Sequence, residues 1–404
     1  MASGDAKLGA LIAEFRRSKG LSLAELAGQT YVSRGWINNV EAGRRWPARE
    51  WVDQVEIVLD AGGLLLPAWD RANQERGSDA ELRQLLKDSE RESELLIAAQ
   101  PDAVELDRIG ESAAKLAVAY LASPARPMLE QARALRGELT RRITSGAVRP
   151  GQLADLYVTL GRVCGIVTYA ALDLGSPESA HTHAKAAWRT ADFAGDNELR
   201  AWVRGTQSLV ARFEKRYILA EAFVEDGFQF AGSGTSEIRL LCGAAQCAAN
   251  LGDGESALTY IERARRARES AGPDSLEGLF GFSPAKQSYY SASSLMWLPD
   301  EPALQVAEAS ALDAIATWEH EPVEQRSLDD EALAHVYLAT ARLKLGEIEG
   351  AMESVRPIMD LPEERQISWI RKRIADLADL LDGDRYHGSI PASDARDELR
   401  AFGA

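Results

Sequence analysis

Apolar residues recur along most of the chain at intervals of three and four positions, the spacing that places them on one face of an α-helix. Near the N-terminus, Leu8, Leu11, Ile12 and Phe15 follow this spacing. Sustained alternation of apolar and polar residues, which is typical of strands, is not found, and Ala, Leu, Glu and Arg dominate the periodic segments. The pattern predicts an all-α protein.

The periodic segments divide the chain into four parts. The apolar segment AGGLLLPAWD ends at residue 70, and the residues after it are polar and rich in charge until amphipathic segments resume near residue 104. Polar composition returns close to the C-terminus. We therefore expect a first domain over 1–70, a polar helical linker over 71–102, a repeat domain over 103–383, and a polar, poorly ordered C-terminal tail over 384–404.

Three segments of the second half resemble one another: LGSPESAHTHAKAA, LGDGESALTYIERA and LGEIEGAMESVRPI. Their alignment superposes Gly175, Gly252 and Gly346, followed five residues later by Ala180, Ala257 and Ala351. A weaker copy sets Lys215 in the glycine position and Ala220 in the alanine position. Glycine allows a turn with positive φ, and a small alanine allows two helices to pack closely. Each repeat therefore predicts a helix pair, and stacked pairs predict a solenoid.

The most specific pattern lies between Leu8 and Pro47. Ser22 is placed to cap a short helix, with Glu25 at the capping-box position three residues later. Ser33 is placed to cap the following helix, which ends at Gly43. The sequence thus predicts two short helices joined by a tight turn.

The stretch from Leu23 to Pro47 reads LAxLAxxxxVSxxxIxxxEAGxRxP and resembles the helix-turn-helix of the Cro/repressor family, also called the xenobiotic-response-element (XRE) family. The resemblance implies a five-helix-type domain whose helix from Ser33 to Glu41 enters the major groove of DNA. It implies DNA contacts by Arg16, Arg17, Ser33, Arg34, Gly35, Trp36, Asn38, Asn39, Arg44 and Arg45. Arg34 suits a guanine edge and Asn39 an adenine edge, whereas Ser33 and the arginines at 44 and 45 suit phosphates.

For several of these residues, a role without DNA contact also stays open at this point. The arginines also suit solvated helix ends, and Trp36 suits either a base contact or packing on the domain's own surface. The charge distribution favours the DNA hypothesis. The whole chain has a net charge of −16, yet residues 1–50 hold eight Lys or Arg and five Asp or Glu.

The second half is also similar to that of actinobacterial regulators that join this helix-turn-helix to tetratricopeptide-like repeats, above all in the segment Leu279–Asp300. The resemblance implies an α-solenoid of tetratricopeptide-like helix pairs that forms a homodimer and senses a peptide or small-molecule effector. The first helix of each pair would line the groove. Arginine and aromatic residues there suit a carboxylate or amide, although aromatic residues at helical spacing also pack in cores. The candidates are Arg200, Trp202, Arg204, Gln207, Arg212, Arg239, Gln246, Asn250, Tyr289 and Trp297.

Catalytic and metal-binding patterns such as GxSxG, GxxxxGK[ST] and HExxH do not occur. His181 and His183 point to different faces of a helix, and Cys242 and Cys247 lie among alanines. The N-terminus lacks a signal-peptide layout. We therefore predict a cytoplasmic protein that is not an enzyme, with no catalytic residues, no cofactor, no metal and no membrane partner.

Together these features predict a sequence-specific transcriptional regulator that binds double-stranded DNA, at a pseudo-palindromic operator, as a homodimer. The alternative is an interaction scaffold, in which the acidic solenoid recruits a protein partner and DNA binding is secondary or lost. Substitution of Arg34 and Asn39 by alanine discriminates between the two, because only a regulator would lose its function.

Overall fold

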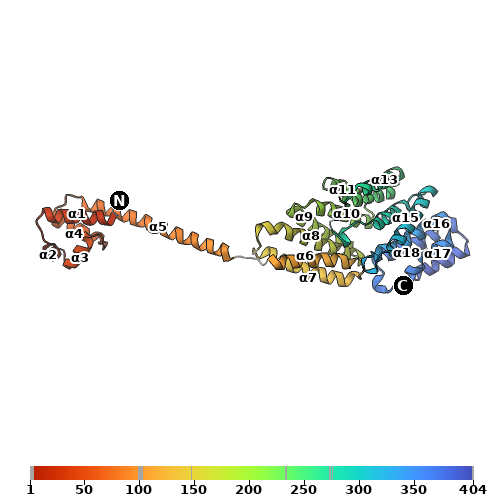
Figure 1. Ribbon diagram of the computed structural model, residues 1–404, viewed down its shortest axis with the longest axis horizontal. Helices are drawn as coiled ribbons and strands as arrows, with labels where there is room; N and C mark the ends of the chain where they lie inside the picture. The colour runs from red at the N-terminus through yellow and green to blue at the C-terminus, as the bar shows by residue number, and fades with distance from the viewer. Residues whose placement is uncertain are drawn as a thin grey trace. The chain divides into compact units, whose positions relative to one another are not determined.

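The computed structural model describes residues 4–98, 103–146, 148–232, 234–272, 274 and 276–402. These residues form helices joined by turns, with no strand among them, which confirms the all-α prediction. The chain divides into two compact units, Met1–Ala99 and Gln100–Ala404 (Figure 1). The division falls inside the predicted linker, and four of that linker's residues, 99–102, lie outside the described ranges.

The N-terminal unit is the predicted five-helix domain. Its helices are α1 (Gly4–Ser18), α2 (Leu23–Gln29), α3 (Arg34–Glu41), α4 (Arg49–Leu59) and α5 (Leu65–Ala98). Their apolar faces meet in one core, with Ile12, Leu26, Ile37 and Val52 fully buried. Helix α5 starts inside this core and runs without a break across residue 70, so the described part of the linker is the continuation of a domain helix.

Helices α1 and α3 approach each other closely at Gly9. A β-carbon at this position would lie 2.3 Å from the carbonyl oxygen of Val40 and 2.7 Å from that of Glu41. Both atoms belong to the backbone and cannot swing away, so only glycine allows this crossing.

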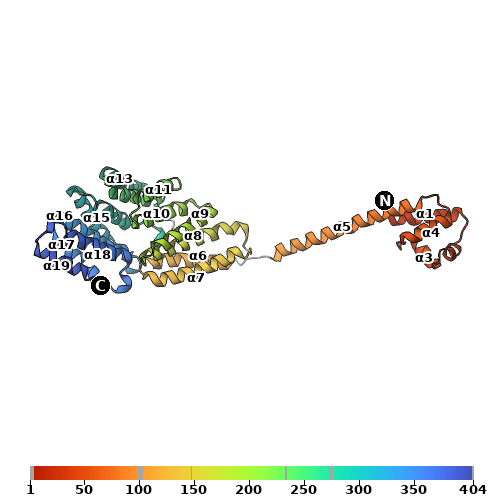
Figure 2. The same ribbon diagram turned by 180° about the vertical axis from the view of Figure 1, so that it is seen from behind.

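The C-terminal unit is built from antiparallel helix pairs stacked one after another (Figures 1 and 2). It opens with α6 (Ala103–Tyr120) and α7 (Ala125–Thr144). The pairs that follow are α8 (Pro150–Asp173) with α9 (Pro177–Ala194), α10 (Asn197–Phe213) with α11 (Tyr217–Phe228), α12 (Ser236–Asn250) with α13 (Gly254–Ser270), α14 (Pro284–Leu295) with α15 (Glu301–Glu319), and α16 (Leu328–Leu345) with α17 (Ile348–Met359). The last pair is α18 (Ser368–Leu381) with α19 (Ile390–Arg400). This arrangement is the helical solenoid that the repeats predict.

The turns inside these pairs fall where the repeat alignment places them. The three aligned glycines have positive φ, and the three aligned alanines are buried against the neighbouring helix: Gly175, Gly252, Gly346, Ala180, Ala257 and Ala351. In the weaker copy, Lys215 adopts the same turn with φ of 59°, and Ala220 is fully buried. The backbone thus keeps the repeat geometry even where the glycine is lost, at the cost of some strain.

The solenoid closes on itself, because α18 returns to the helices that begin the repeats. Ser368 Oγ donates to the carbonyl oxygen of Leu172 on α8 at 2.6 Å, and Lys372 Nζ donates to that of Phe213 on α10 at 2.8 Å. The start of α16 is joined to the end of α6 by a backbone hydrogen bond from Leu328 to Leu121 at 3.0 Å. These contacts join helices far apart in sequence.

The structure corrects the prediction of a poorly ordered tail over 384–404, because most of this segment is ordered. It forms a turn of 3-10 helix (Asp384–Tyr386) and then α19, whose inner face buries Leu399. Tyr386 Oη donates to the carbonyl oxygen of Leu343. Most residues of this segment are polar because only one face of α19 packs against the rest of the unit.

Helix α8 is long and apolar enough to cross a membrane over Gly151–Asp173 if only length and composition are considered. Half of that stretch is buried inside the protein, against α7 and α9. Buried core helices share this composition, so the feature is weak support for a membrane span.

Candidate functional site

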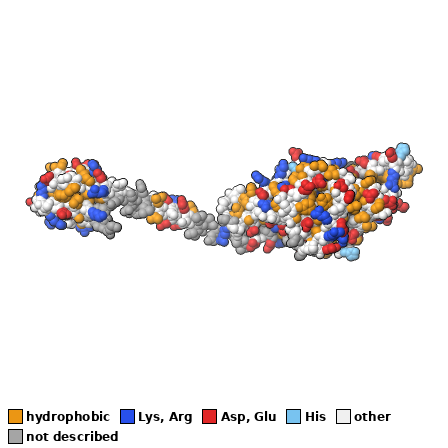
Figure 3. All heavy atoms as spheres, turned by 90° about the horizontal axis from the view of Figure 1, so that it is seen from above, with side chains coloured by type: hydrophobic (Ala, Val, Ile, Leu, Met, Phe, Trp, Pro, Cys, Tyr) orange, Lys and Arg blue, Asp and Glu red, His pale blue; other side chains and the backbone are white. Residues whose placement is uncertain are grey.

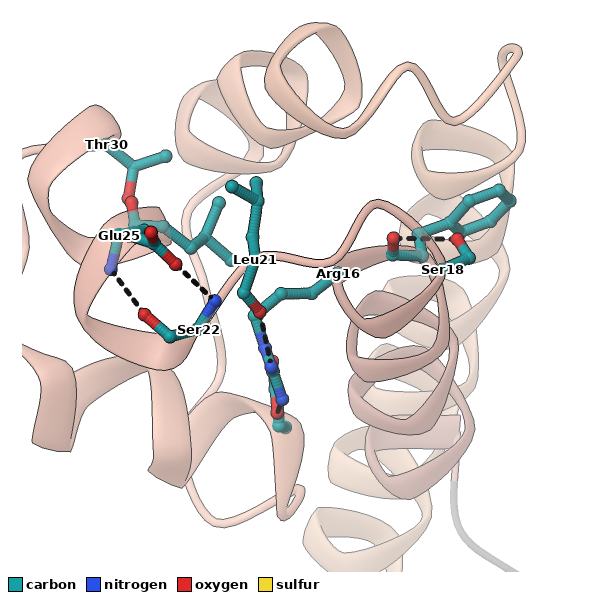
Figure 4. Close-up of polar contacts among 9 residues, drawn as sticks. Arg16, Ser18, Leu21, Ser22, Glu25 and Thr30 are labelled. Carbon is teal, nitrogen blue, oxygen red and sulfur yellow. Dashed lines mark hydrogen bonds and ion pairs between the residues drawn. The ribbon is translucent and has the colours of Figure 1, made fainter.

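Two capped helices present the first candidate site, a nucleic-acid interface. Helix α2 starts with the predicted capping box: Ser22 Oγ accepts from the Glu25 amide at 3.2 Å, and Glu25 Oε2 accepts from the Ser22 amide at 2.8 Å (Figure 4). Helix α3 starts with Ser33, whose Oγ accepts from the Trp36 amide at 3.1 Å. These bonds satisfy amide groups at the helix starts and fix where each helix begins.

Helix α3 is strongly two-sided. Ile37 and Val40 face the core, whereas Arg34, Gly35 and Asn38 are exposed to solvent. Asn39 is half-buried, and Ser33 and Arg44 are exposed at the two ends of the helix. The side chains that suit base edges and phosphates therefore lie along one accessible edge of the helix.

The structure corrects the prediction for Arg16. Its guanidinium forms two hydrogen bonds to the Glu41 carboxylate, at 2.7 and 2.8 Å. A third hydrogen bond, to the carbonyl oxygen of Leu21, is 2.9 Å long (Figure 4). The side chains of Arg16 and Glu41 are each only 10% exposed. Arg16 therefore joins α1 to the end of α3 and is not available to a phosphate, whereas its neighbour Arg17 is exposed.

The structure favours packing over base contact for Trp36. Its ring lies edge-on to Trp51, with the centroids 4.4 Å apart, and it is half-buried. The guanidinium of Arg45 lies 5.7 Å from the Trp36 ring. Trp36 thus packs against Trp51, and the exposed guanidinium of Arg45 lies over its ring.

Tyr31 is a candidate that the sequence analysis missed. It lies in the turn between α2 and α3, has φ of 54° and is 91% exposed. An exposed phenol in this turn can donate a hydrogen bond to a phosphate oxygen. No pattern in the sequence marks it, because a tyrosine with positive φ is rare.

Exposed cations outnumber exposed acids around this site. Figure 3 shows Lys and Arg side chains at several points on the surface of the N-terminal unit. Those exposed near the two helices are Arg17, Lys19, Arg34, Arg44 and Arg45. Such solvated cations are the ordinary means of attracting a phosphate backbone.

The comparison with protein families agrees with this geometry. Residues 7–69 match a family model described as a helix-turn-helix domain. A search of curated proteins finds no relative of the chain. The N-terminal unit is therefore a helix-turn-helix domain. Its presence supports the prediction that the protein is a DNA-binding regulator.

The second candidate site is a partly open cavity within the C-terminal unit. It is lined mainly by the first helices of the pairs, namely α8, α10, α12, α14, α16 and α18, together with the end of α6. Because α18 contacts α8 and α10, helices from the beginning and the end of the unit line the same cavity.

Six of the ten predicted effector residues line this cavity: Arg212, Arg239, Gln246, Asn250, Tyr289 and Trp297. Gln246 Nε2 donates to Ser293 Oγ, and Tyr289 Oη lies 3.3 Å from Tyr337 Oη. The structure thus brings together residues from α10, α12, α14 and the turn after α14. Their contact with an effector stays a prediction.

The other four predicted residues do not line the cavity. Arg200 pairs with Asp192 at 2.8 Å, and Trp202 is buried in the core against Phe280. Arg204 Nε bonds to Asp226 at 2.5 Å, and its guanidinium donates to Gln207 Oε1 at 2.8 Å. We therefore remove Arg200, Trp202, Arg204 and Gln207 from the effector site, because neighbouring side chains already satisfy or cover them.

Three carboxyl groups line one part of the cavity. Asp173 accepts from Tyr120 Oη at 2.5 Å, and burial raises the pKa of this carboxyl well above its ordinary value. Burial also raises the pKa of Asp329 to about 7, although Arg365 at 2.9 Å acts in the opposite direction. Asp330 accepts from Ser327 Oγ at 2.6 Å and lies 3.7 Å from Lys286. Proximity and burial make these acids costly to ionise together.

Several cavity residues were not predicted from the sequence, all for the same reason. No local pattern indicates that they lie at a common site. Asp173 ends α8, Lys286 begins α14, and Asp330 begins α16. Burial lowers the pKa of Lys286. Other missed residues are Tyr120, Tyr169, Tyr290, Tyr337, Trp369 and Arg373.

Proposed function

We propose that this protein is a sequence-specific transcriptional regulator whose helix α3 reads an operator in the major groove. The observation that supports this most directly is the accessible edge of α3, on which Arg34, Gly35 and Asn38 are exposed in a domain that matches helix-turn-helix proteins. Arg34 donates to a guanine edge and Asn39 bonds to an adenine edge, while Arg17, Arg44 and Arg45 position the domain on phosphates.

The proposed regulator acts in the cytoplasm as a homodimer, with the C-terminal solenoid as the dimerising part. Two recognition helices then meet half-sites about one helical turn apart on a pseudo-palindromic operator. The cavity receives the effector, which shifts the population between arrangements that can and cannot span both half-sites. The effector is bound and not converted.

Selection of bound sequences from random duplex DNA tests this function. The full-length protein is expected to enrich an inverted repeat, and Arg34→Ala with Asn39→Ala is expected to abolish the enrichment. The matched control is Arg71→Ala with Asn73→Ala, the same residue types on exposed positions of α5, which should enrich the wild-type sequence.

Two results would contradict the proposal. One is enrichment of the same sequence by the Arg34/Asn39 variant, which would exclude α3 as the reading element. The other is an affinity independent of salt, because each neutralised phosphate should contribute a slope of about −0.9 in log affinity against log salt. Sedimentation at the concentrations used for DNA binding tests the dimer separately.

A further inference from the structure

Two buried arginines that line the cavity of the C-terminal unit form no ion pair with its described acids. Arg212 is 9% exposed and Arg239 is 6% exposed, and both line the cavity. Among the described residues, neither has a carboxylate within ion-pair distance. A buried cation is normally paired, so this arrangement calls for a counter-charge from elsewhere.

Arg212 is the less satisfied of the two. Its Nε is buried without a hydrogen-bond partner, and no described side chain accepts a hydrogen bond from the rest of its guanidinium. The group lies 5.8 Å from the ring centroid of Tyr290, on whose face it rests. Its planar fork of donors thus stays free for a ligand, and such a fork matches a carboxylate in two parallel bonds.

Arg239 is held beside the cavity by neutral partners. It donates to Tyr169 Oη at 2.8 Å and to Thr206 Oγ1 at 2.9 Å, which fix its orientation but leave its charge unbalanced. Gly205 on α10 makes room for it, since a β-carbon there would lie 3.0 Å from Arg239 Nε. The positive charges of Arg239 and Arg212 both oppose the rise in the pKa of Tyr169 that burial causes, so both act on one part of the cavity.

The remaining walls define the body of the ligand. Tyr289, Tyr290, Trp297 and Trp369 supply aromatic surface, which suits an apolar or planar group. The carboxyl groups of Asp173, Asp329 and Asp330 line the same cavity and are already costly to ionise together, so a second ligand anion beside them would be unfavourable. The contact of α18 with α8 brings the last helix pair against the start of the repeats, so side chains from both ends of the unit surround this space and suit a small molecule.

We propose that the cavity binds a small aromatic monocarboxylate, with Arg212 gripping the carboxylate and Arg239 supplying the second positive charge. The inference rests on the proposed effector role of this cavity, and it names the chemical class of the effector. It places the aromatic body of the ligand against the tyrosines and tryptophans of α14, the turn after α14, and α18.

Calorimetry with the full-length protein and no DNA tests this inference. The probes are benzoate, indole-3-acetate and 2-naphthoate, each measured against its neutral amide, together with inorganic phosphate. At least one carboxylate is expected to bind about tenfold or more tighter than its amide and than phosphate. Equal binding of acid and amide, equal binding of phosphate, or no binding of any carboxylate up to about 10 mM would overturn the proposal.

Variants on α10 locate the site. Arg212→Met is expected to lose the preference for the acid over the amide, whereas Arg204→Met, whose parent arginine pairs with Asp226 outside the cavity, is expected to keep it. Retention of the preference by Arg212→Met would overturn the assignment. If circular dichroism shows that Arg212→Met does not fold, Arg212→Lys keeps the charge without the fork and is expected to weaken the preference.

The test of ligand binding and the test of DNA binding can fail independently of each other. A protein that enriches an operator but binds no carboxylate contradicts only the ligand class. A protein that binds the carboxylate through Arg212 but enriches no operator contradicts the regulator and keeps the ligand site.

Discussion

The N-terminal unit exposes its candidate arginines, Arg34, Arg44 and Arg45, whereas the C-terminal unit buries Arg212 and Arg239 beside a cavity. Exposed cations remain hydrated and attract any phosphate backbone, so their contribution is long-ranged, weakly selective and screened by salt. Buried cations have lost their water, so they discriminate strongly between a ligand that supplies an anion and one that does not. The same side chain thus suits two tasks, and burial decides between them.

The two units also differ in how they are held together. The N-terminal unit depends on single contacts that no other residue repeats, such as the crossing at Gly9 and the ion pair of Arg16 with Glu41. The C-terminal unit repeats one contact, a turn followed by a buried alanine, along its length. A single substitution should therefore damage the first unit more than the second.

The largest effect is expected from Gly9→Ala. The new β-carbon would meet the carbonyl oxygens of Val40 and Glu41, so α1 and α3 must separate, at a cost of about 4 kcal/mol. Amide hydrogen exchange in the intact protein should show loss of protection in α3 and no change in the C-terminal unit. Gly28→Ala on α2, where a β-carbon meets nothing within 4 Å, is the control and should keep protection. Full protection in Gly9→Ala would disprove the close crossing.

A slightly smaller effect is expected from Arg16→Met. This change leaves the Glu41 carboxylate nearly buried without its partner, which should destabilise the N-terminal unit by about 3 kcal/mol. The exposed neighbour provides the control, because Arg17→Met should weaken DNA binding and leave stability nearly unchanged. Unchanged hydrogen-exchange protection in Arg16→Met would contradict the structural role of this ion pair and make Arg16 a candidate for phosphate contact again.

The C-terminal unit is expected to lose stability as the pH rises. Burial raises the pKa of Asp329 to about 7, so the folded state holds this proton where the unfolded chain has released it. That stabilisation is fully present near the unfolded pKa and disappears as the pH passes through 7. Between pH 5 and 8 the loss from Asp329 alone should be roughly 2–3 kcal/mol.

Thermal denaturation from pH 5 to 8 checks this dependence. Asp329→Asn should make it shallower, because the amide does not titrate. The slope that remains comes from other buried acids such as Asp173, whose pKa burial also raises. The control is Asp253→Asn at the exposed start of α13, where hydrogen bonds from Ser256 lower the pKa of the carboxyl. Its contribution is lost only as the pH falls below the tested window, so the control should retain the wild-type slope. An unchanged slope in Asp329→Asn would show that Asp329 titrates normally.

The smallest effect is expected from Arg44→Met. Loss of one exposed phosphate contact should weaken operator binding by about 1 kcal/mol and reduce the salt slope by about 0.9. The preferred sequence should not change, because a phosphate contact does not read bases. Arg71→Met on α5 should leave the salt slope as it is, and an unchanged slope in Arg44→Met would exclude that phosphate contact.

Much of the N-terminal site is predictable because its signals are local. Ser22 and Ser33 cap the two helices as expected, and Ile37 lies in the core. Arg16 is the exception. Its partner is 25 residues away, and an arginine among basic neighbours looks solvated until the folded chain brings Glu41 beside it.

The sequence by itself determined the helices, their caps and the repeat turns, because these depend on interactions within a few residues along the chain. Only the tertiary structure decided which polar side chains meet. Arg204 and Arg212 lie on the same helix, yet one is neutralised by Asp226 and the other faces a cavity that α14, α16 and α18 complete. Desolvation and pairing depend on every neighbour in space, and the neighbours of Arg212 are set only when the solenoid closes.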